Sequence, residues 1–311
     1  MQDRALNWFV SVFCALTVGC VGGGREEMHN RLPPAFEAAM RDDTHKLRVL
    51  LADGVSVNSQ DEEYGATLLM WAFRFGSTNV VSNLIEAGAD VNLRDKTHNT
   101  ALMYCARLGD YGVTASSNLV ALGASVNVTN SNGQTPFSRA VASSNKPLIR
   151  FLIARGAMPD VQLAPLSETI VMLAAWRSDV DTLELMCALT QYSSDARDLR
   201  GRNAVFYALD AVFFARDDTP RFQKKLAVLI RHGYEVNVTN RDGQTPLIVA
   251  SKGCDFEVVK VLVSCGADPA ARDLSNKTAL DWAIENQCSS IEEYLRQLKR
   301  VGEDDGIKVG P

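Results

Sequence analysis

The sequence predicts an all-α solenoid of about eight helix-turn-helix repeats joined by β-hairpin loops. Two recurring motifs and their spacing carry this prediction. One motif closes each unit, as in Gly88–Asn92 (GADVN) and Gly123–Asn127 (GASVN). The other opens a unit, as in Gly243–Leu247 (GQTPL). The interval from Thr67 to Thr100 is 33 residues, and a fixed period of this length indicates stacked structural repeats.

The residues of one unit explain its shape. The hydroxyls of Thr135 and Thr245 can cap a helix, and the proline that follows each of them fits the first helical position. Apolar residues then recur at helical spacing, and Gly266 ends the second helix where a left-handed residue is usual. Since one helix pair cannot bury its apolar face alone, stacked copies must share a continuous core.

The period and the opening motif resemble the ankyrin repeat, over residues 33–300. The resemblance implies a protein-binding scaffold that is not an enzyme and needs no cofactor, metal or small-molecule substrate. One motif position departs from the family, which has a histidine there that ties neighbouring repeats. We therefore expect more apolar packing at the contacts between neighbouring repeats, here called seams. The residues found in its place are Met70, Met103, Ser138, Met172, Phe206, Ile248 and Asp281.

The resemblance also implies that a protein partner contacts the inner helices and the hairpin tips. Aromatic residues and arginine are the types that dominate binding hot spots. The inner-helix candidates are Trp71, Arg74, Phe75, Tyr104, Arg107, Trp176, Arg177 and Tyr207. The candidates at the tips are Arg94, Lys96, Arg241 and Arg272.

Two interruptions of the period predict insertions. The interval from Asn203 to Thr245 is 42 residues, which places about nine extra residues near Phe213 and Phe214. These aromatic residues either lengthen a helix that packs on the next repeat or form a protrusion that binds a partner. A smaller insertion is expected near 110–112.

The first residues predict export and anchoring. A short apolar run ends in Thr17-Val18-Gly19-Cys20, which resembles the lipobox of bacterial lipoproteins. The resemblance implies a signal peptide over 1–19 and a lipidated Cys20 followed by a flexible tether over 20–32. The repeat domain then occupies 33–300, and 301–311 form a disordered tail. The expected location is the bacterial cell envelope. The alternatives are an uncleaved anchor, or a secreted or host-directed effector or inhibitor without the lipid.

Charge and motif content argue against other function classes. The net charge is −5 over 311 residues, so the sequence shows no basic footprint for nucleic acid. It contains no H-E-x-x-H, G-x-S-x-G or phosphate-loop pattern. The cysteines lack zinc-site spacing. Cys254 and Cys288 fall near the same turn of neighbouring repeats, and they are the candidates for a disulfide in an exported domain.

Overall fold

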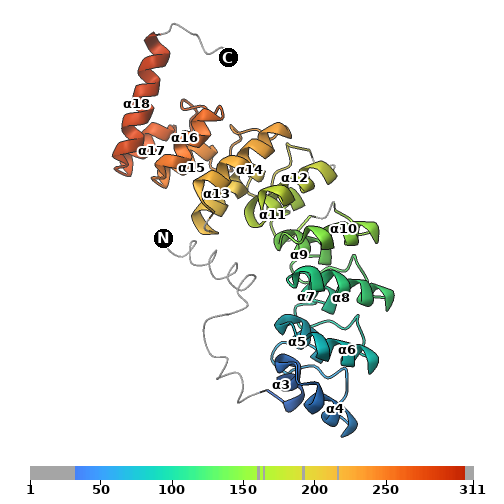
Figure 1. Ribbon diagram of the computed structural model, residues 1–311. Coiled ribbons are helices and arrows are strands. Elements are labelled where there is room, and N and C mark those ends of the chain that lie inside the picture. Colours follow the sequence, from blue (N-terminus) through green and yellow to red (C-terminus); the bar gives the residue numbers. More distant parts are fainter. Residues whose placement is uncertain (1–31, 160–161, 164, 191–192, 216, 305–311) are drawn as a thin grey trace.

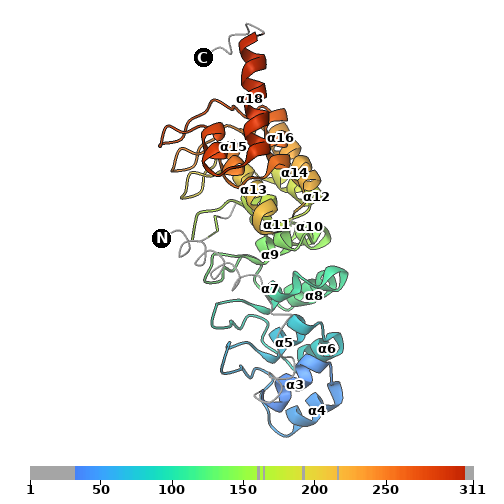
Figure 2. The same ribbon diagram turned by 90° about the vertical axis from the view of Figure 1, so that its left-hand side faces the viewer.

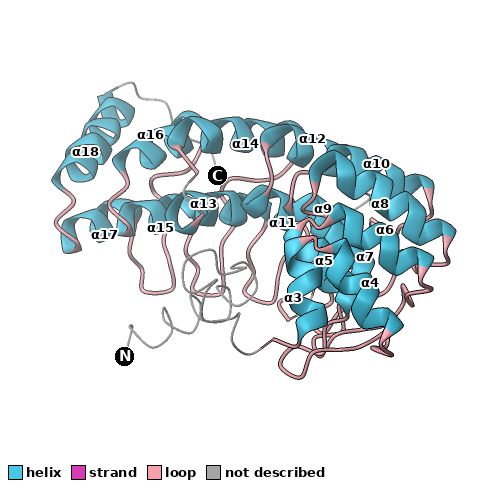
Figure 3. Ribbon diagram, turned by 60° about the horizontal axis from the view of Figure 1, so that its bottom comes forward, coloured by secondary structure: helices cyan, strands magenta, loops and turns pink. Residues whose placement is uncertain are grey.

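Sixteen helices in the described residues stack as eight antiparallel pairs. A computed structural model describes residues 32–304 except 160–161, 164, 191–192 and 216, with side chains described as far as Arg300. The first helix of every pair lies in one row and the second lies in a parallel row (Figure 3). The array bends so that the first row follows its concave side (Figure 1). The predicted count of eight repeats is therefore confirmed.

We call the two rows the inner and outer helices, and number the repeats 1 to 8 along the chain. The inner helices are α3 (Pro34–Arg41), α5 (Leu68–Phe75), α7 (Ala101–Cys105), α9 (Pro136–Ala142), α11 (Ile170–Arg177), α13 (Ala204–Phe214), α15 (Pro246–Lys252) and α17 (Ala279–Glu285). The outer helices are α4 (Thr44–Ala52), α6 (Thr78–Glu86), α8 (Gly109–Ala121), α10 (Lys146–Ala154), α12 (Val180–Leu189), α14 (Thr219–Arg231), α16 (Phe256–Ser264) and α18 (Ser289–Asp304).

The loops between repeats project beside the inner row as a series of extended fingers (Figure 2). Two isolated antiparallel bridges occur in them, Gln60 with Thr67 and Leu163 with Glu168. Otherwise the fingers are hydrogen-bonded turns, and no longer strand forms in the described residues. The expected hairpin loops are thus present as hairpin-shaped turns.

The predicted caps begin the inner helices. The hydroxyl oxygens of Thr67, Thr135 and Thr245 accept the backbone N–H three residues later. In repeat 2 the sulfur of Met70 accepts the Thr67 N–H at 3.5 Å, and Ser138 does the same for Thr135 at 2.9 Å. Met70 and Ser138, two of the residues that replace the family's histidine, therefore help to cap their own helices.

Asparagines supply one recurring set of hydrogen bonds between repeats. Asn92, Asn127 and Asn237 each donate a side-chain N–H to the glycine carbonyl that ends the next repeat, at 3.1, 2.9 and 3.0 Å. The side-chain oxygen of each accepts a backbone N–H from that same turn. The seams thus combine apolar packing with a repeated polar link, which the sequence reading did not foresee.

Both predicted insertions are absorbed by longer helices. α8 starts at Gly109 and takes in the extra residues near 110–112, where Gly112 lies so close to the Cys105 carbonyl that a Cβ would meet it at 2.3 Å. In repeat 6, α13 extends to Phe214 and α14 has 13 residues. Phe213 packs against Gly253 of the next repeat, while Phe214 is 61% exposed.

The structure tests the predicted C-terminal tail in part, but not the predicted N-terminal segments. α18 continues to Asp304, so residues 301–304 are helical and the tail predicted from 301 starts too early. The expected signal peptide, Cys20 and nearly all of the tether lie outside the described residues.

The candidate cysteine pair forms a disulfide that links repeats 7 and 8. Cys254 and Cys288 are bonded, with their Cα atoms 5.4 Å apart and a sequence separation of 34 residues. Cys254 is exposed and Cys288 is nearly buried. Cys105, Cys187 and Cys265 are free thiols. The predicted pairing is confirmed.

Candidate functional site

Several aromatic residues of the inner helices brace the fingers. Trp71, four residues after the helix cap Thr67, donates its indole N–H to Asp61 at 2.9 Å. Tyr104 stands at the same place in repeat 3 and donates its hydroxyl to Asp95 at 2.8 Å. These aspartates also accept backbone N–H groups of their own fingers. The aromatic ring therefore fixes the finger to the helix.

The same brace recurs in repeats 6 and 8. Tyr207 lies 2.9 Å from Asp198, and Trp282 donates to Asp273 at 2.7 Å. Trp71 and Tyr207 are only 1% and 3% exposed. The prediction that Trp71 and Tyr207 contact a partner is therefore wrong. Their rings lie in the core, and their polar atoms are already hydrogen-bonded. Tyr104 is half-buried, so part of its ring remains accessible to a partner.

Arginines of repeats 2 to 5 gather on the concave side. Arg74 and Arg107 stand seven residues after the caps of α5 and α7, and both are exposed. Arg177 ends α11 and is half-buried. Arg139 takes the place in repeat 4 that the bracing aromatic has elsewhere. We call Arg74, Arg107, Arg139 and Arg177 the arginine stripe.

Electrostatics shows that these side chains lie near one another. Burial lowers the pKa of Arg177 below its ordinary value, and the positive charges of Arg107 and Arg139 lower it further. Burial likewise lowers the pKa of Arg139, with a further contribution from Arg107. Arg74 in turn acts on Tyr104, the neighbour of Arg139. Arg107, Arg139 and Arg177 thus act on one another electrostatically, and Arg74 and Arg139 both act on Tyr104.

Aromatic rings hold the two ends of the stripe. The guanidinium of Arg74 lies 5.7 Å from the ring centre of Tyr64 and 6.0 Å from that of Phe75. Phe75 stacks on buried Trp71 with ring centres 5.5 Å apart. At the other end, the guanidinium of Arg177 lies 4.2 Å from the ring centre of Trp176. Stacking on a ring leaves the N–H edge of a guanidinium available for a ligand.

Arg74, Arg107 and Arg177 could be predicted as contact residues from the sequence, but Arg139 and the stripe itself were not predicted. The arginines are dispersed in a chain of net negative charge and form no basic run. For Arg74 and Arg107, the offset from the helix cap was the available signal. Counted from Thr67 and Thr100, Arg74 and Arg107 occupy the same register and must lie on the same face.

The finger candidates are exposed and separate from the stripe. Arg94, Lys96, Arg241 and Arg272 are all exposed. Lys96 donates to the Glu62 carbonyl of the preceding finger, and Arg272 donates to the carbonyl of Asn276 at 2.7 Å. Part of their hydrogen-bonding capacity is therefore already used within and between fingers.

A buried polar network joins repeats 5 and 6. Arg202 pairs with Asp198 at 2.9 Å and with Asp210 at 2.7 Å. The Tyr207 hydroxyl lies 2.9 Å from both Asp198 and Glu168. A single hydroxyl hydrogen cannot serve two carboxylates at once. The network therefore favours a retained proton.

This network predicts a pH dependence of stability. Burial raises the pKa of Asp210 to about 6, with Arg202 opposing. The folded state therefore holds a proton that the unfolded chain releases near pH 4, so stability falls as pH rises through about 6. Urea unfolding should give a free energy about 1 kcal/mol larger at pH 5.0 than at pH 7.5 from this group. Asp210→Asn should remove that difference. An equal difference in wild type and variant would contradict the assignment.

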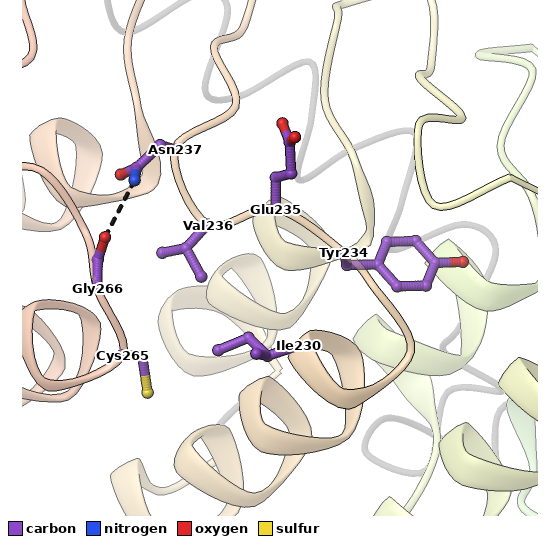
Figure 4. Close-up of a pocket in the computed structure, with 7 residues that line it drawn as sticks. All are labelled: Ile230, Tyr234, Glu235, Val236, Asn237, Cys265 and Gly266. Atoms are coloured by element: carbon purple, nitrogen blue, oxygen red, sulfur yellow. Dashed lines mark hydrogen bonds between the residues drawn. The ribbon is translucent and has the colours of Figure 1, made fainter. Parts of the chain in front are cut away.

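A small recess lies between the outer ends of repeats 6 and 7. Its volume is about 420 Å³, and Figure 4 shows its lining residues. Asn237 reaches across to the Gly266 carbonyl at 3.0 Å, whereas Glu235 and Tyr234 point away from Cys265 (Figure 4). The polar groups do not converge, so the recess is a gap at a repeat seam.

In the described part of the chain, no three His, Cys, Asp or Glu side chains are grouped to hold a metal.

Comparison with known proteins identifies the repeat. A family model described as ankyrin repeats (3 copies) matches residues 35–116 and 221–305, together more than half of the chain. The chain belongs to the ankyrin-repeat family. Ankyrin repeats suggest a scaffold for protein–protein interaction, which agrees with a site made of a long concave face and a row of fingers.

The similar proteins are longer than this chain. This chain is 27% identical over 263 residues to "Protein glp-1" of Caenorhabditis elegans, covering 78% of this chain and 19% of that protein. It is 32% identical over 287 residues to "Ankyrin repeat and KH domain-containing protein mask-1" of the same organism, covering 90% and 10%. It is 28% identical over 184 residues to "B-cell lymphoma 3 protein homolog" of Mus musculus, covering 59% and 39%. The chain thus spans less than two fifths of each of these relatives.

The helices were also compared with the length of a membrane span. Among the described residues, none of the helices combines enough length with enough apolar character to cross a bilayer.

Proposed function

We propose that this chain is a protein-binding scaffold of the bacterial cell envelope, held to a membrane by a lipid on Cys20. The observation that carries the binding role is the arginine stripe, in which two exposed and two half-buried arginines, a hot-spot residue type, lie on the concave face of an ankyrin array. Stacked repeats present a rigid, extended surface, so a partner can be bound without reorganising the domain.

The disulfide supports an oxidising location. Disulfides persist outside the cytosol, where thiol reductants do not keep cysteines reduced. Cys254 is exposed, so a reducing compartment would have access to this bond. Together with the lipobox-like residues Thr17–Cys20, the bond favours the periplasmic side or the cell surface.

Substitution of Cys20 tests the anchor. In the bacterium, wild-type protein should incorporate a fatty-acid analogue and sediment with membranes, because two or three acyl chains bind a bilayer stably. Cys20→Ala should lose the label and move largely to the soluble fraction. Cys14→Ala, a cysteine in the same apolar run, serves as the matched control and should leave both properties unchanged.

The test also separates the alternative. Unchanged membrane association of the unlabelled Cys20→Ala protein would overturn lipid anchoring in favour of an uncleaved segment. Unlabelled wild-type protein in the culture medium would replace the envelope role with a secreted effector or inhibitor.

A further inference from the structure

The arginine stripe lacks the internal partners that charged residues have elsewhere on the inner helices. In repeat 6, the residue seven after the cap is Asp210, and it pairs with Arg202 at 2.7 Å. In repeat 8 it is Glu285, which pairs with Lys277. Over the described residues, no carboxylate forms an ion pair within 4.0 Å of Arg74, Arg107 or Arg177.

The acids nearest to the stripe are already engaged. Asp95 is 5% exposed and accepts the N–H groups of Thr97 and Asn99 as well as the Tyr104 hydroxyl. Glu168 is 7% exposed and lies 2.9 Å from Tyr207. Buried carboxylates held by fingers cannot turn outward to neutralise the stripe. Asp95 and Glu168 act on Arg139 and Arg177 electrostatically without forming ion pairs with them.

The chemistry of the stripe selects carboxylates on a peptide. A guanidinium stacked on a ring, as in Arg177 on Trp176, offers two parallel N–H donors that match a carboxylate. Half-buried rings beside the stripe, Phe75 and Trp176, add apolar surface that an extended chain can cover. A nucleic acid fits less well, because the rest of the chain carries a net charge of −9 once four arginines are subtracted from the total of −5.

We propose that the concave face of repeats 2 to 5 binds an acidic segment of the partner protein, with its Asp or Glu side chains paired to the arginine stripe. This inference rests on the proposed scaffold function and names the chemistry of the partner. Fingers of the later repeats then contribute to other parts of the interface.

Selection from a random twelve-residue peptide display library on the full chain tests the proposal. The selected peptides should be enriched in Asp and Glu, and their binding should weaken as salt is raised. Fluorescence anisotropy should then show that Arg107→Glu with Arg177→Glu weakens a selected acidic peptide by about 30-fold or more, as expected for hot-spot charges.

Two matched variants make this result interpretable. Arg150→Glu with Lys224→Glu changes the net charge equally on exposed positions of outer helices α10 and α14, and should retain wild-type affinity. Arg107→Gln with Arg177→Gln keeps side-chain bulk in case the reversed charges disturb folding, and should also lose most of the affinity. Circular dichroism verifies the fold of each variant.

The outcomes separate this inference from the scaffold function. Selected peptides without acidic enrichment, or acidic peptides that bind all variants equally, would overturn the acidic partner while leaving a peptide-binding scaffold. A single-stranded oligonucleotide that binds more tightly than the peptides would also overturn it. If no peptide is selected and no protein crosslinks to the chain, the scaffold function itself fails.

Discussion

Replacing Asp217 with alanine should destabilise the middle of the array by about 3–5 kcal/mol, because it leaves a buried lysine without its counter-ion. The Lys225 side chain is 1% exposed, and its ammonium donates to Asp217 at 2.7 Å and to the Ala175 carbonyl at 2.8 Å. This contact ties the long repeat 6 to inner helix α11 of repeat 5. Burial already lowers the pKa of Lys225 below its ordinary value, with Asp217 opposing. Chemical unfolding followed by circular dichroism measures the loss.

Two further variants isolate the buried charge as the cause. Arg221 also pairs with Asp217, at 3.0 Å, but its side chain is 53% exposed, so Arg221→Ala should cost less than about 1 kcal/mol. Adding Lys225→Met to Asp217→Ala should recover much of the stability, since an apolar side chain of similar length replaces the stranded charge. A double variant as unstable as Asp217→Ala alone would show that the loss has another origin.

Removing the disulfide should destabilise the C-terminal repeats by about 3–4 kcal/mol, on the chain-entropy estimate for a closed loop of 34 residues. The bond fastens α17 and α18 to repeat 7, and within the described residues repeat 8 packs against repeat 7 alone. Hydrogen exchange should therefore rise first in repeats 7 and 8 of Cys254→Ser with Cys288→Ser.

Reduction provides the matching control. Dithiothreitol should lower the unfolding midpoint of the wild type to that of the double serine variant and leave the variant unchanged. Cys265→Ser alters a free thiol in the same region and should have little effect on either measurement. A wild-type midpoint that does not respond to reductant would contradict a stabilising disulfide.

Most of the fold could be predicted because each repeat carries local signals. Thr caps, prolines at the first helical position and glycines such as Gly266 (φ +88°) mark helix ends within a few residues of sequence. The Cys254–Cys288 pairing followed from the period alone, since equivalent positions in adjacent repeats are neighbours in space. The polar links of Asn92 and Asn237 were less visible, because asparagine is common in any turn.

The site was harder to predict, because it depends on which face each side chain takes. Trp71 and Tyr207 have the composition of a binding surface, yet their offset of four residues from the cap turns them inward against a finger aspartate. An offset of seven turns Arg74 and Arg107 outward. The buried pair Lys225 and Asp217 arises from the insertion in repeat 6, whose conformation follows no repeat rule.

Site-specific photocrosslinking in cells that produce the protein tests directly whether the concave face binds a protein. A benzoylphenylalanine placed at Arg107 probes the concave face, and one placed at Arg150 of α10 probes an exposed site on an outer helix. We expect a discrete crosslinked protein from position 107 and none from position 150. A crosslink obtained only from position 150, or from neither position, would contradict a protein-binding concave surface.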